Sequence, residues 1–530
     1  MNHHNPKCSL FLGLYLILSS FSYAIEVDDI IIIPKVVVDT SGFSGDLAID
    51  PNTGRLHCIW VTSDYKLMHK SRSLDGIWSD TEIIPTLGLP VYAEETSGEN
   101  RWARRCCGIN VDEGSVIHIV YGVDDGDVYY VCGQPNQWTE PYRVVSQDFY
   151  ACHPDIEIIN DDLFVVWEDA RDPLIKRVYQ ASRINNQWSE PSVILLADNP
   201  DLYKSDNDIL YIIGRYFHID WPVMHHNIMF GYSVPGYLDW EIKQITDEEY
   251  RVGKAARIAI YQDKIYVAWS TSVGVEASGD WDKKGRLYCA KSREPGKFWN
   301  PYYSKREGPI YTVATGDPYG AVAIYSDGTV FYANGKAGEM ARQSSRFFKI
   351  WLGKWWSGTR YAEWENGVVH LDCDGKTVWA IGSSTGYSEG EVSVSGYTNP
   401  FAGYLDFSNQ APEIVTFPDT FVVTNSLWQT SCEATDPDGD PVKYSLIFNP
   451  SACSIDSSSG LIQWQVSEIE TRVLGVKASD NRGKCDVHYF RLHVVDQIYH
   501  VHFSVDQQQG TAPFTVQFTN LSQGPIEQVH

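Results

Sequence analysis

The sequence predicts an all-β protein. Apolar and polar residues alternate along most of the chain, and the turns between these segments are rich in Gly, Asp and Asn. An amphipathic helix of useful length is not visible in the sequence. The chain has 530 residues, which is too many for one hydrophobic core, so we expect two or more domains.

A repeat of four short strands fills the first 400 residues. DLAIDPNTGRLHCIW (46–60), which leads to Trp78, and DIEIINDDLFVVW (155–167), which leads to Trp188, are two examples of its first half. The tryptophan that closes each repeat falls at positions 78, 138, 188, 240, 299 and 355. Four strands with a period of about 40 to 60 residues are typical of a β-propeller, in which neighbouring blades cover each other's faces. We expect most of these tryptophans to pack between blades.

The repeat predicts a seven-bladed β-propeller over residues 25–400. First strands are expected near residues 46, 108, 155, 208, 257, 321 and 368. The seventh repeat shows only three strands, and IIIPKVVVD (31–39) is expected to supply its outer strand and close the ring. Six blades are the alternative, because the last two repeats are the least regular.

One turn of the first repeat reads Ser73-Leu74-Asp75-Gly76-Ile77-Trp78. It resembles the Asp-box turn (Ser-x-Asp-x-Gly-x-x-Trp) of sialidase-like propellers. The resemblance covers about residues 30 to 400 and implies architecture. It does not imply sialidase chemistry, because the Arg-Ile-Pro segment of sialidases is absent from the sequence.

The N-terminus has the features of a secretory signal peptide, residues 1–24. Lys7 precedes an apolar run over 10–18, and Ser22-Tyr23-Ala24 forms a small-x-small cleavage site. The run is too short to span a membrane. We therefore expect a secreted protein, extracellular or at the cell surface, without membrane insertion.

The charge of the chain restricts its partners. The formal net charge is -26, from 68 acidic and 42 basic residues, which argues against nucleic acid. Aromatic residues make up 13% of the chain, with 18 Trp, and such residues suit both strands and sugar-stacking faces. Carbohydrate or an extracellular protein is the expected partner.

Two smaller modules follow a linker at 401–410. ATDPDGDPVKYSL (434–446) and VKASDNRG (476–483) lie in a unit, 411–497, whose closely spaced strands predict an Ig-like β-sandwich. This unit resembles cadherin-like and putative-Ig repeats of bacterial surface proteins. VHFSVDQQQGTAPFTVQFTNLSQG (501–524) resembles the start of a PKD domain, so 498–530 is expected to be a truncated PKD-like domain, a partial second β-sandwich.

Acidic residues in the first sandwich suggest calcium. Asp436, Asp438 and Asp440 occupy alternate positions, and Asp480 lies in a neighbouring turn, so their oxygens could converge on one Ca²⁺. The alternative is a solvated Asp/Gly turn in which Asp caps its own backbone.

Polar residues in the loops between strands are the candidate ligand-binding residues of the propeller. The first group consists of three arginines, Arg101, Arg104 and Arg105. These side chains could bind a carboxylate or sulfate of an acidic sugar, and the alternative is a solvated loop. A second group offers paired carboxylates for acid and base catalysis, or an ion-paired turn; its members are Glu168, Asp169, Arg171 and Asp172. His153 could join a metal site with His225 and His226, or hydrogen-bond within its loop, and Asp282 lies in another long loop.

The leading hypothesis is a secreted or cell-surface binding and adhesion protein with a propeller face for carbohydrate or protein ligands. The sequence contains no Gly-rich phosphate loop and no Gly-x-Ser-x-Gly elbow. The alternative is a secreted carbohydrate-active enzyme, a glycoside hydrolase or polysaccharide lyase, acting at the same face. No catalytic residue can be assigned from the sequence.

Overall fold

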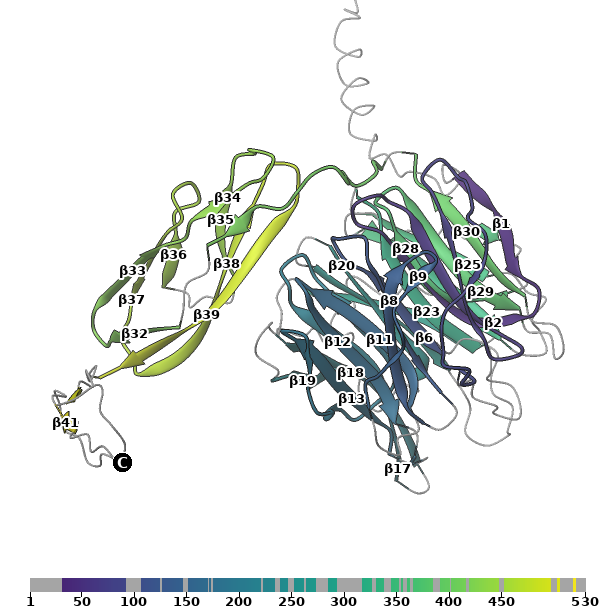
Figure 1. Ribbon diagram of the computed structural model, residues 1–530, viewed down its shortest axis with the longest axis horizontal. Helices are drawn as coiled ribbons and strands as arrows, with labels where there is room; N and C mark the ends of the chain where they lie inside the picture. Colours follow the sequence, from purple (N-terminus) through teal and green to yellow (C-terminus); the bar gives the residue numbers. More distant parts are fainter. Residues whose placement is uncertain are drawn as a thin grey trace, which may run out of the picture. The chain divides into compact units, whose positions relative to one another are not determined.

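The computed structural model divides the chain into two compact units, whose main boundary lies between Phe407 and Ser408 (Figure 1). The boundary falls inside the range 401–410 that was expected to be a linker. The structure describes residues 31–520 except 92–105, 124–125, 146–150, 170, 173–174, 221–222, 234–238, 246–251, 262–263, 273–284, 293–316, 327–329, 338–344, 352–353, 356–359, 363–365, 385–390, 401, 416–418, 448–451, 497–502 and 506–517. The predicted signal peptide, 1–24, lies outside these residues.

All regular elements of the described residues are β-strands, which confirms the all-β prediction. Within the same residues, no helix is long and apolar enough to cross a membrane.

The first four sheets of the first unit follow one another along the chain (Figure 1). The first sheet contains β2 (Gly42–Ile49), β3 (Leu56–Thr62), β4 (Leu67–Arg72) and β5 (Glu82–Ile83). The second contains β6 (Cys107–Val111), β7 (Ile117–Gly122), β8 (Val128–Gln134), β9 (Gln137–Trp138) and β10 (Tyr142–Arg143). The third contains β11 (Ala151–Ile159), β12 (Asp162–Asp169), β13 (Arg177–Ile184), β14 (Gln187–Trp188) and β15 (Ser192–Leu195). The fourth contains β16 (Asp198–Lys204), β17 (Leu210–Asp220), β18 (Val223–Ser233) and β19 (Glu241–Gln244).

The next eight strands form one sheet from two antiparallel groups, which are joined by a single parallel pair, Ala255 and Tyr319. The first group is β20 (Val252–Tyr261), β21 (Lys264–Ser272) and β22 (Gly285–Ser292). The second is β23 (Asp317–Ile324), β24 (Val330–Ala337), β25 (Ser345–Trp351), β26 (Lys354–Trp355) and β27 (Arg360–Ala362).

The last sheet of the unit joins its two ends. It contains β28 (Asn366–Cys373), β29 (Thr377–Ser384), β30 (Val392–Thr398) and, as outer strand, β1 (Ile31–Asp39). Ile31 lies opposite Thr398, and Val37 lies opposite Ser393. This pairing confirms the prediction that residues 31–39 supply the missing outer strand. It also covers the edge of β30, which would otherwise be open to pairing with another chain.

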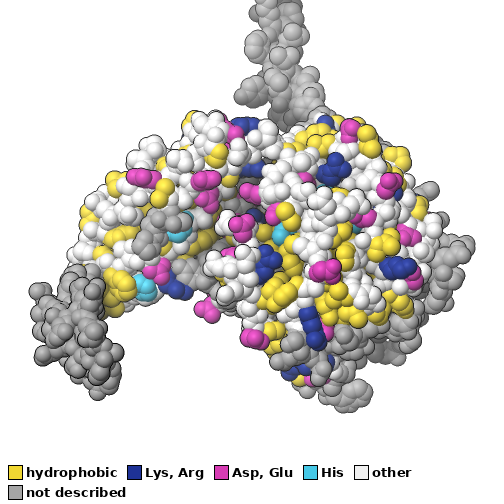
Figure 2. Space-filling view, viewed as in Figure 1, with side chains coloured by type: hydrophobic (Ala, Val, Ile, Leu, Met, Phe, Trp, Pro, Cys, Tyr) yellow, Lys and Arg dark blue, Asp and Glu magenta, His cyan; other side chains and the backbone are white. Residues whose placement is uncertain are grey.

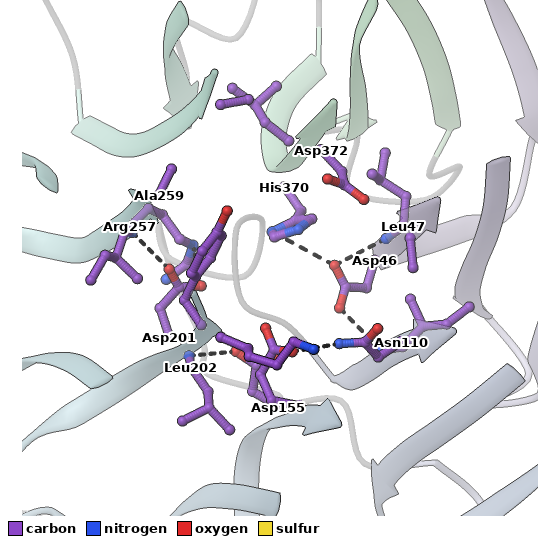
Figure 3. Close-up of a pocket in the computed structure, with 18 of the residues that line it drawn as sticks. Asp46, Leu47, Asn110, Asp155, Asp201, Leu202, Arg257, Ala259, His370 and Asp372 are labelled. Carbon is purple, nitrogen blue, oxygen red and sulfur yellow. Dashed lines mark hydrogen bonds and ion pairs between the residues drawn. The ribbon is translucent and has the colours of Figure 1, made fainter. Parts of the chain in front are cut away.

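The first strand of each group of strands lies at a common axis. Residues of β2, β6, β11, β16, β20, β23 and β28 line one cavity there (Figure 3). The sheets are therefore arranged like the blades of a propeller, each contacting the next through its faces.

The first strand of the fourth sheet was expected near residue 208, and this prediction is wrong. That strand is β16, Asp198–Lys204, and the apolar run from Leu210 is the second strand. The residues Asp-Asn-Pro-Asp at its start are typical of a turn. Here they form a β-bulge between Asp198 and Asp201, with Asn199 in the left-handed region at φ 50°.

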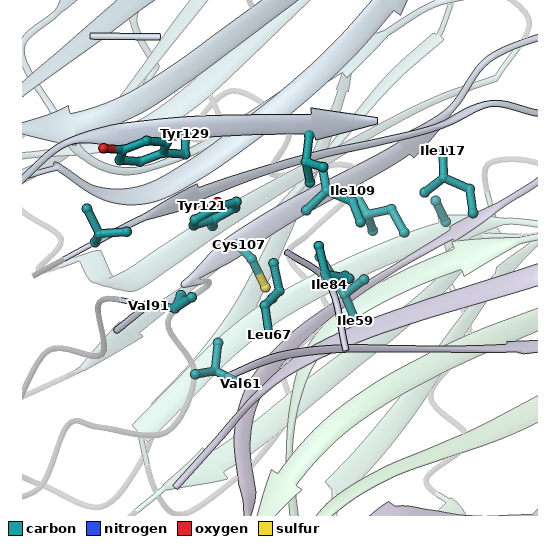
Figure 4. Close-up of a cluster of buried hydrophobic side chains, with 14 of the residues drawn as sticks. Ile59, Val61, Leu67, Ile84, Val91, Cys107, Ile109, Ile117, Tyr121 and Tyr129 are labelled. Carbon is teal, nitrogen blue, oxygen red and sulfur yellow. The ribbon is translucent and has the colours of Figure 1, made fainter. Parts of the chain in front are cut away.

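Apolar side chains and tryptophans join neighbouring sheets. In the cluster between the first and second sheets, Ile59 and Val61 of β3 meet Ile109 of β6 and Tyr121 of β7 (Figure 4). Full burial of each such side chain stabilises the fold by about 1.5–3 kcal/mol.

Three tryptophans of the repeat, Trp138, Trp188 and Trp240, contact the preceding sheet, which agrees with the prediction that they pack between blades. Trp138 donates from Nε1 to Glu82 Oε2 (3.2 Å), and Trp240 donates to Gln180 Oε1 (2.7 Å). The ring of Trp188 stacks on Tyr142, with centroids 5.9 Å apart.

The turn that resembles an Asp-box connects β4 to the outer part of the first sheet. The N–H of Ile77 donates to Ser73 Oγ (3.1 Å), and the N–H of Ser73 donates to the carbonyl of Ile77 (2.9 Å). Gly76 has φ 94°, a conformation that favours glycine. The turn brings Trp78 opposite Arg72.

The second unit contains two main sheets that enclose one apolar core. One sheet has the order β32 (Thr420–Val423), β39 (Cys485–Val495), β38 (Glu470–Ser479) and β35 (Lys443–Ile447). The other has β33 (Leu427–Ser431), β37 (Leu461–Gln465) and β36 (Cys453–Ile455). Two small pairs are β31 (Glu413–Ile414) with β34 (Ala434–Thr435), and β40 (Phe503–Val505) with β41 (Phe518–Asn520). Both main sheets contribute to the core, through Trp428 and Trp464 on one side and Phe490 and Leu492 on the other.

Candidate functional site

The axial cavity of the first unit has a volume of about 280 Å³ and a polar lining (Figure 3). The lining strands β2, β6, β11, β16 and β28 are the inner edges of their sheets, so their outward N–H groups lack a strand partner, whereas β20 and β23 pair with each other at Ala255 and Tyr319. Buried N–H groups need acceptors. Acidic side chains of the same strands supply them.

Two aspartates accept hydrogen bonds from their own strand and from the next one. Asp46 accepts the N–H of Leu47 at Oδ1 (3.0 Å) and the N–H of Ile109 at Oδ2 (3.2 Å). In the same way, Oδ2 of Asp155 accepts the N–H of Leu202 (2.8 Å). The Asp46 carboxylate therefore connects β2 to β6, and the Asp155 carboxylate connects β11 to β16.

Two further aspartates continue this arrangement around the axis. Asp201 Oδ2 accepts the N–H of Ile258 (2.9 Å), which ties β16 to β20. Asp372 Oδ2 accepts the N–H of Ile49 (3.0 Å), which ties β28 back to β2. We call Asp46, Asp155, Asp201 and Asp372 the axial aspartates.

Two carboxyl groups of the cavity have raised pKa values. Burial, reinforced by the neighbouring Asp155, raises the pKa of Glu157 to about 8. Glu157 also accepts a hydrogen bond from Asn110 Nδ2 (2.7 Å). Burial raises the pKa of Asp372 to about 7, although its backbone hydrogen bonds favour the ionised form.

Basic groups are fewer in the cavity. Arg257 Nε lies 3.6 Å from Asp201 Oδ1, and His370 Nδ1 lies 3.7 Å from Asp46 Oδ1 (Figure 3). Lys204 also lines the cavity.

A second polar cluster lies where β11 begins and β12 ends. His153 has φ 49° at a β-bulge of β11, and its Nδ1 lies 2.7 Å from Glu168 Oε2. Lys176 Nζ donates to Glu168 Oε1 (2.8 Å), and the N–H of Asn199 donates to Oε2 (3.0 Å). Burial alone would raise the pKa of Glu168, but His153 and Lys176 outweigh it, and its pKa lies well below the usual range.

The neighbouring carboxylate, Asp169, is held by Arg171. Arg171 donates from Nε to Asp169 Oδ1 (2.9 Å) and from its terminal nitrogen to Oδ2 (2.6 Å). The Asp169 side chain is 3% exposed and that of Arg171 is 46% exposed, so a buried anion fixes a guanidinium that reaches solvent. Asp172 accepts the N–H of Ile175 (3.2 Å) and lies in the same turn.

The structure thus brings His153, Glu168, Asp169, Arg171 and Asp172 to one end of the third sheet. Both Glu168 and Asp169 have cationic partners, as an ion-paired turn requires. Arg101, Arg104, Arg105 and Asp282 lie outside the described residues, as do the side chains of His225 and His226.

In the second unit, Asp436, Asp438 and Asp440 each offer an oxygen within 4.8 Å of the others. Asp436 Oδ1 accepts the N–H groups of Asp438 (2.9 Å) and Asp440 (3.1 Å), which shapes the turn. Arg482 lies against this cluster, 3.6 Å from Asp438 Oδ2 and 3.4 Å from Asp440 Oδ2.

The side chain of Asp480 accepts hydrogen bonds within its own turn and from Asn409. Its Oδ1 accepts the N–H groups of Arg482 (2.8 Å) and Lys484 (3.0 Å), and its Oδ2 accepts Asn409 Nδ2 (2.7 Å). Among the described residues, Asn409 Oδ1 and Asp436 Oδ2 are buried oxygens without a hydrogen-bond partner. Asn409 was not singled out from the sequence, because it is far from the acidic turns along the chain.

The axial residues were also missed in the sequence. A signal for them exists: an acidic residue followed by Leu or Ile recurs at Asp46-Leu47, Asp155-Ile156 and Asp201-Leu202. These pairs directly follow a β-bulge inside β2, β11 and β16, and only the ring of strands shows that they meet at one axis.

Comparisons with known proteins find solved structures that resemble the chain at low sequence identity. No family model and no curated protein matches it. A lectin, BP39L from Burkholderia pseudomallei, is 11% identical, with 69% of this chain and 99% of the lectin covered and a TM-score of 0.47. The polysaccharide lyase Uly1 is 10% identical, with 70% and 100% covered and a TM-score of 0.41.

An α-L-arabinofuranosidase of Fusarium graminearum, arb93a, is 12% identical, with 56% of this chain and 93% of the enzyme covered and a TM-score of 0.38. Such low identities and TM-scores do not identify a function. The propeller-like arrangement is defined by the strand pairing described above.

Proposed function

We propose that this chain is a secreted or cell-surface protein whose first unit, a seven-bladed sialidase-like β-propeller, binds carbohydrate. Seven inner strands around one cavity, and the pairing of β1 with β30, support the blade number. The second unit, with two sheets around one core, fits an Ig-like sandwich that acts as a spacer or adhesive module.

The observation that carries the binding proposal is the rigid polar cluster at the end of the third sheet. Buried Glu168 and Asp169 fix Lys176 and Arg171 in place, and the Arg171 guanidinium reaches solvent. Preorganised donors of this kind suit sugar hydroxyl and carboxylate groups, because little side-chain entropy is lost on binding. Arg101, Arg104 and Arg105, singled out from the sequence, are proposed as further ligand-binding residues.

Charges on the surface fit a carbohydrate or protein ligand better than a nucleic acid. The chain carries a net charge of -26. On the face shown in Figure 2, lysine and arginine side chains are dispersed among acidic ones. A nucleic acid requires basic residues gathered in one patch.

A glycan array with the chain and its Arg171→Gln variant tests the proposal. We expect binding to a restricted set of glycans and a loss of about tenfold in affinity for the variant. Arg472→Gln, which changes an exposed arginine of the second unit, is the matched control. Absence of glycan binding, or equal loss for both variants, would contradict the proposal.

A second candidate function is that of a glycoside hydrolase or polysaccharide lyase. Glu157 and Asp372, with raised pKa values in one cavity, favour it, because a general acid must hold its proton near neutral pH. Glu168 does not suit this role, since His153 and Lys176 hold its pKa well below the usual range. Release of new sugar ends from a bound glycan, abolished in Glu157→Gln, would favour the enzyme; binding without turnover would exclude it for that glycan.

We also propose that Asp436, Asp438 and Asp440 bind Ca²⁺, with Asn409 as a further ligand and Asp480 holding Asn409 in place. The unpartnered oxygens of Asp436 and Asn409 support this, since Ca²⁺ takes six or more oxygen ligands. Arg482 competes with the ion, because its guanidinium already lies against two of the carboxylates.

Calcium titration followed by the thermal midpoint of the second unit tests this site. We expect stabilisation by Ca²⁺, a larger effect in Arg482→Gln, and none in Asp438→Asn. Glu468→Gln, an exposed carboxylate of the same unit, should behave like the unmodified chain. An unchanged midpoint in both the unmodified chain and Arg482→Gln would overturn the proposal.

A further inference from the structure

The axial cavity contains more acidic than basic groups. Five carboxyl groups line it, from the four axial aspartates and Glu157. Arg257 and Lys204 are the cationic side chains of the lining, with His370 as a third basic group. A ligand that brings positive charge would therefore be favoured over a neutral or anionic one.

Burial strengthens this preference. Asp46, Asp155, Asp201 and Arg257 are each less than 5% exposed, so water screens their charges poorly. The pKa values of Glu157 and Asp372 are raised because too little positive charge offsets their burial.

The spacing of these groups argues against a bare metal ion. Among the described residues, Asp436, Asp438 and Asp440 are the group whose oxygens converge within 4.8 Å, and the cavity has no such group. Direct calcium ligands lie only 2.3–2.6 Å from the ion, so the axial carboxylates are too widely spread to share one. A cation with several spaced donor groups can reach them.

The volume limits the size of that ligand. Pockets for drug-sized molecules measure about 300–1,000 Å³. The axial cavity, at about 280 Å³, therefore suits a molecule of one ring. The lining combines acidic acceptors with the amide of Asn110 and the phenol of Tyr203, which suits a ligand rich in hydroxyl groups.

We propose that the axial cavity binds a single amino-sugar unit, with its ammonium group close to Asp155 and Glu157 of β11 and its hydroxyl groups on the remaining lining. The sugar part of this inference rests on the proposed carbohydrate-binding function, whereas the ammonium part rests on the cavity alone. Binding near neutral pH releases protons, because the bound cation favours the ionised form of Glu157.

Calorimetric titration of the full 530-residue chain with D-glucosamine, D-glucose and N-acetyl-D-glucosamine tests the inference. At about pH 6.5 we expect D-glucosamine to bind at least about tenfold more tightly than the two neutral sugars. The measured heat should differ between buffers of different ionisation enthalpy, which reports the released protons. Equal affinity for the three sugars, or no binding of D-glucosamine, would overturn the inference.

Glu157→Gln is the diagnostic variant, because the amide keeps the shape of the side chain and its ability to accept from Asn110. It should weaken D-glucosamine binding by about fivefold or more, while Glu190→Gln, an exposed residue of the third sheet, should not. Unchanged binding by Glu157→Gln would contradict the inference.

The glycan array and this titration distinguish the two proposals. Glycan binding that is lost in Arg171→Gln, without D-glucosamine binding, leaves the proposed function standing and removes the axial site. D-glucosamine binding that depends on Glu157, without array binding, supports the axial site and contradicts the proposed function.

Discussion

Glu157 shows how one buried acid sets a pH dependence. Its pKa is about 8 in the folded chain against 4.5 for an ordinary glutamic acid, so between these values the folded state holds a proton that the unfolded state releases. The free energy of unfolding therefore falls as the pH rises from about 4.5 to about 8.

Glu157→Gln removes this titration. We expect the variant to be more stable than the unmodified chain at about pH 8, by on the order of 2 kcal/mol, and to differ little at about pH 4.5. Urea denaturation at both pH values measures the difference. A variant that is equally destabilised at both values would contradict the prediction.

Glu168 has the opposite behaviour. Its pKa lies below the usual range in the folded chain, so its contribution is present above about pH 4.5 and is lost as the pH falls below that value. Glu168→Gln leaves Lys176 and His153 without their anion. We expect a loss of about 3–5 kcal/mol at neutral pH that shrinks on acidification, measured by urea denaturation.

Asp172→Asn is the control for Glu168. It lies in the same turn, yet its side chain accepts the N–H of Ile175 at the long distance of 3.2 Å. We expect a loss below about 1 kcal/mol. A similar loss for both variants would show that the turn, and not the buried ion pair, determines stability.

At the scale of the strand, the axial aspartates accept the backbone hydrogen bonds that an adjacent strand would otherwise accept. Asp155→Ala leaves the N–H of Ile156 in β11 and that of Leu202 in β16 without their acceptor. Each buried, unsatisfied donor costs about 1–3 kcal/mol, so we expect the variant to lose roughly 2–5 kcal/mol. Asp161→Ala, in the exposed turn after β11, should lose little; thermal unfolding of both variants measures the contrast.

The outer strand β1 stabilises the first unit by covering the edge of β30. Deletion of Ile31–Asp39 exposes the full edge of β30, and we expect a lower thermal midpoint and concentration-dependent light scattering. Lys35→Ala, which removes only the half-exposed ion pair with Glu391, should change stability by less than about 1 kcal/mol. A deleted chain that stays monomeric and equally stable would contradict this assignment.

At the scale of the molecule, the two units have separate cores, so their stabilities can be changed one at a time. Phe490→Ala in the second unit and Phe230→Ala in the first each remove a fully buried ring and should cost about 3–5 kcal/mol. Calorimetry should show each variant lowering a different unfolding transition. One transition that moves in both variants would contradict separate cores.

Much of the architecture could be predicted from the sequence, because strand alternation and the spaced tryptophans are local patterns. The outer strand at 31–39 followed from counting strands in the last repeat. The start of the fourth sheet could not be recognised, since Asp198 to Asp201 have the composition of a turn and form a strand only beside the axis.

Less of the candidate site could be predicted from the sequence. Glu168, Asp169 and Arg171 could be singled out because they are neighbours, but the pairing of Glu168 with Lys176 and His153 is visible only in the structure. The axial acids come from strands far apart in the chain, and their shared environment, with the raised pKa of Glu157, depends on closure of the ring.

The pairing of β1 with β30 also affects the order in which the strands pair during synthesis. A ribosome completes Ile31–Asp39 long before it completes Val392–Thr398, so the strand made first is among the last to find its partner. Such distant pairing is slow, because the closure entropy of the whole intervening chain opposes it. Until synthesis reaches β30, the nascent chain carries β1 without its partner strand, so a chaperone could bind β1 and premature association between chains could begin there.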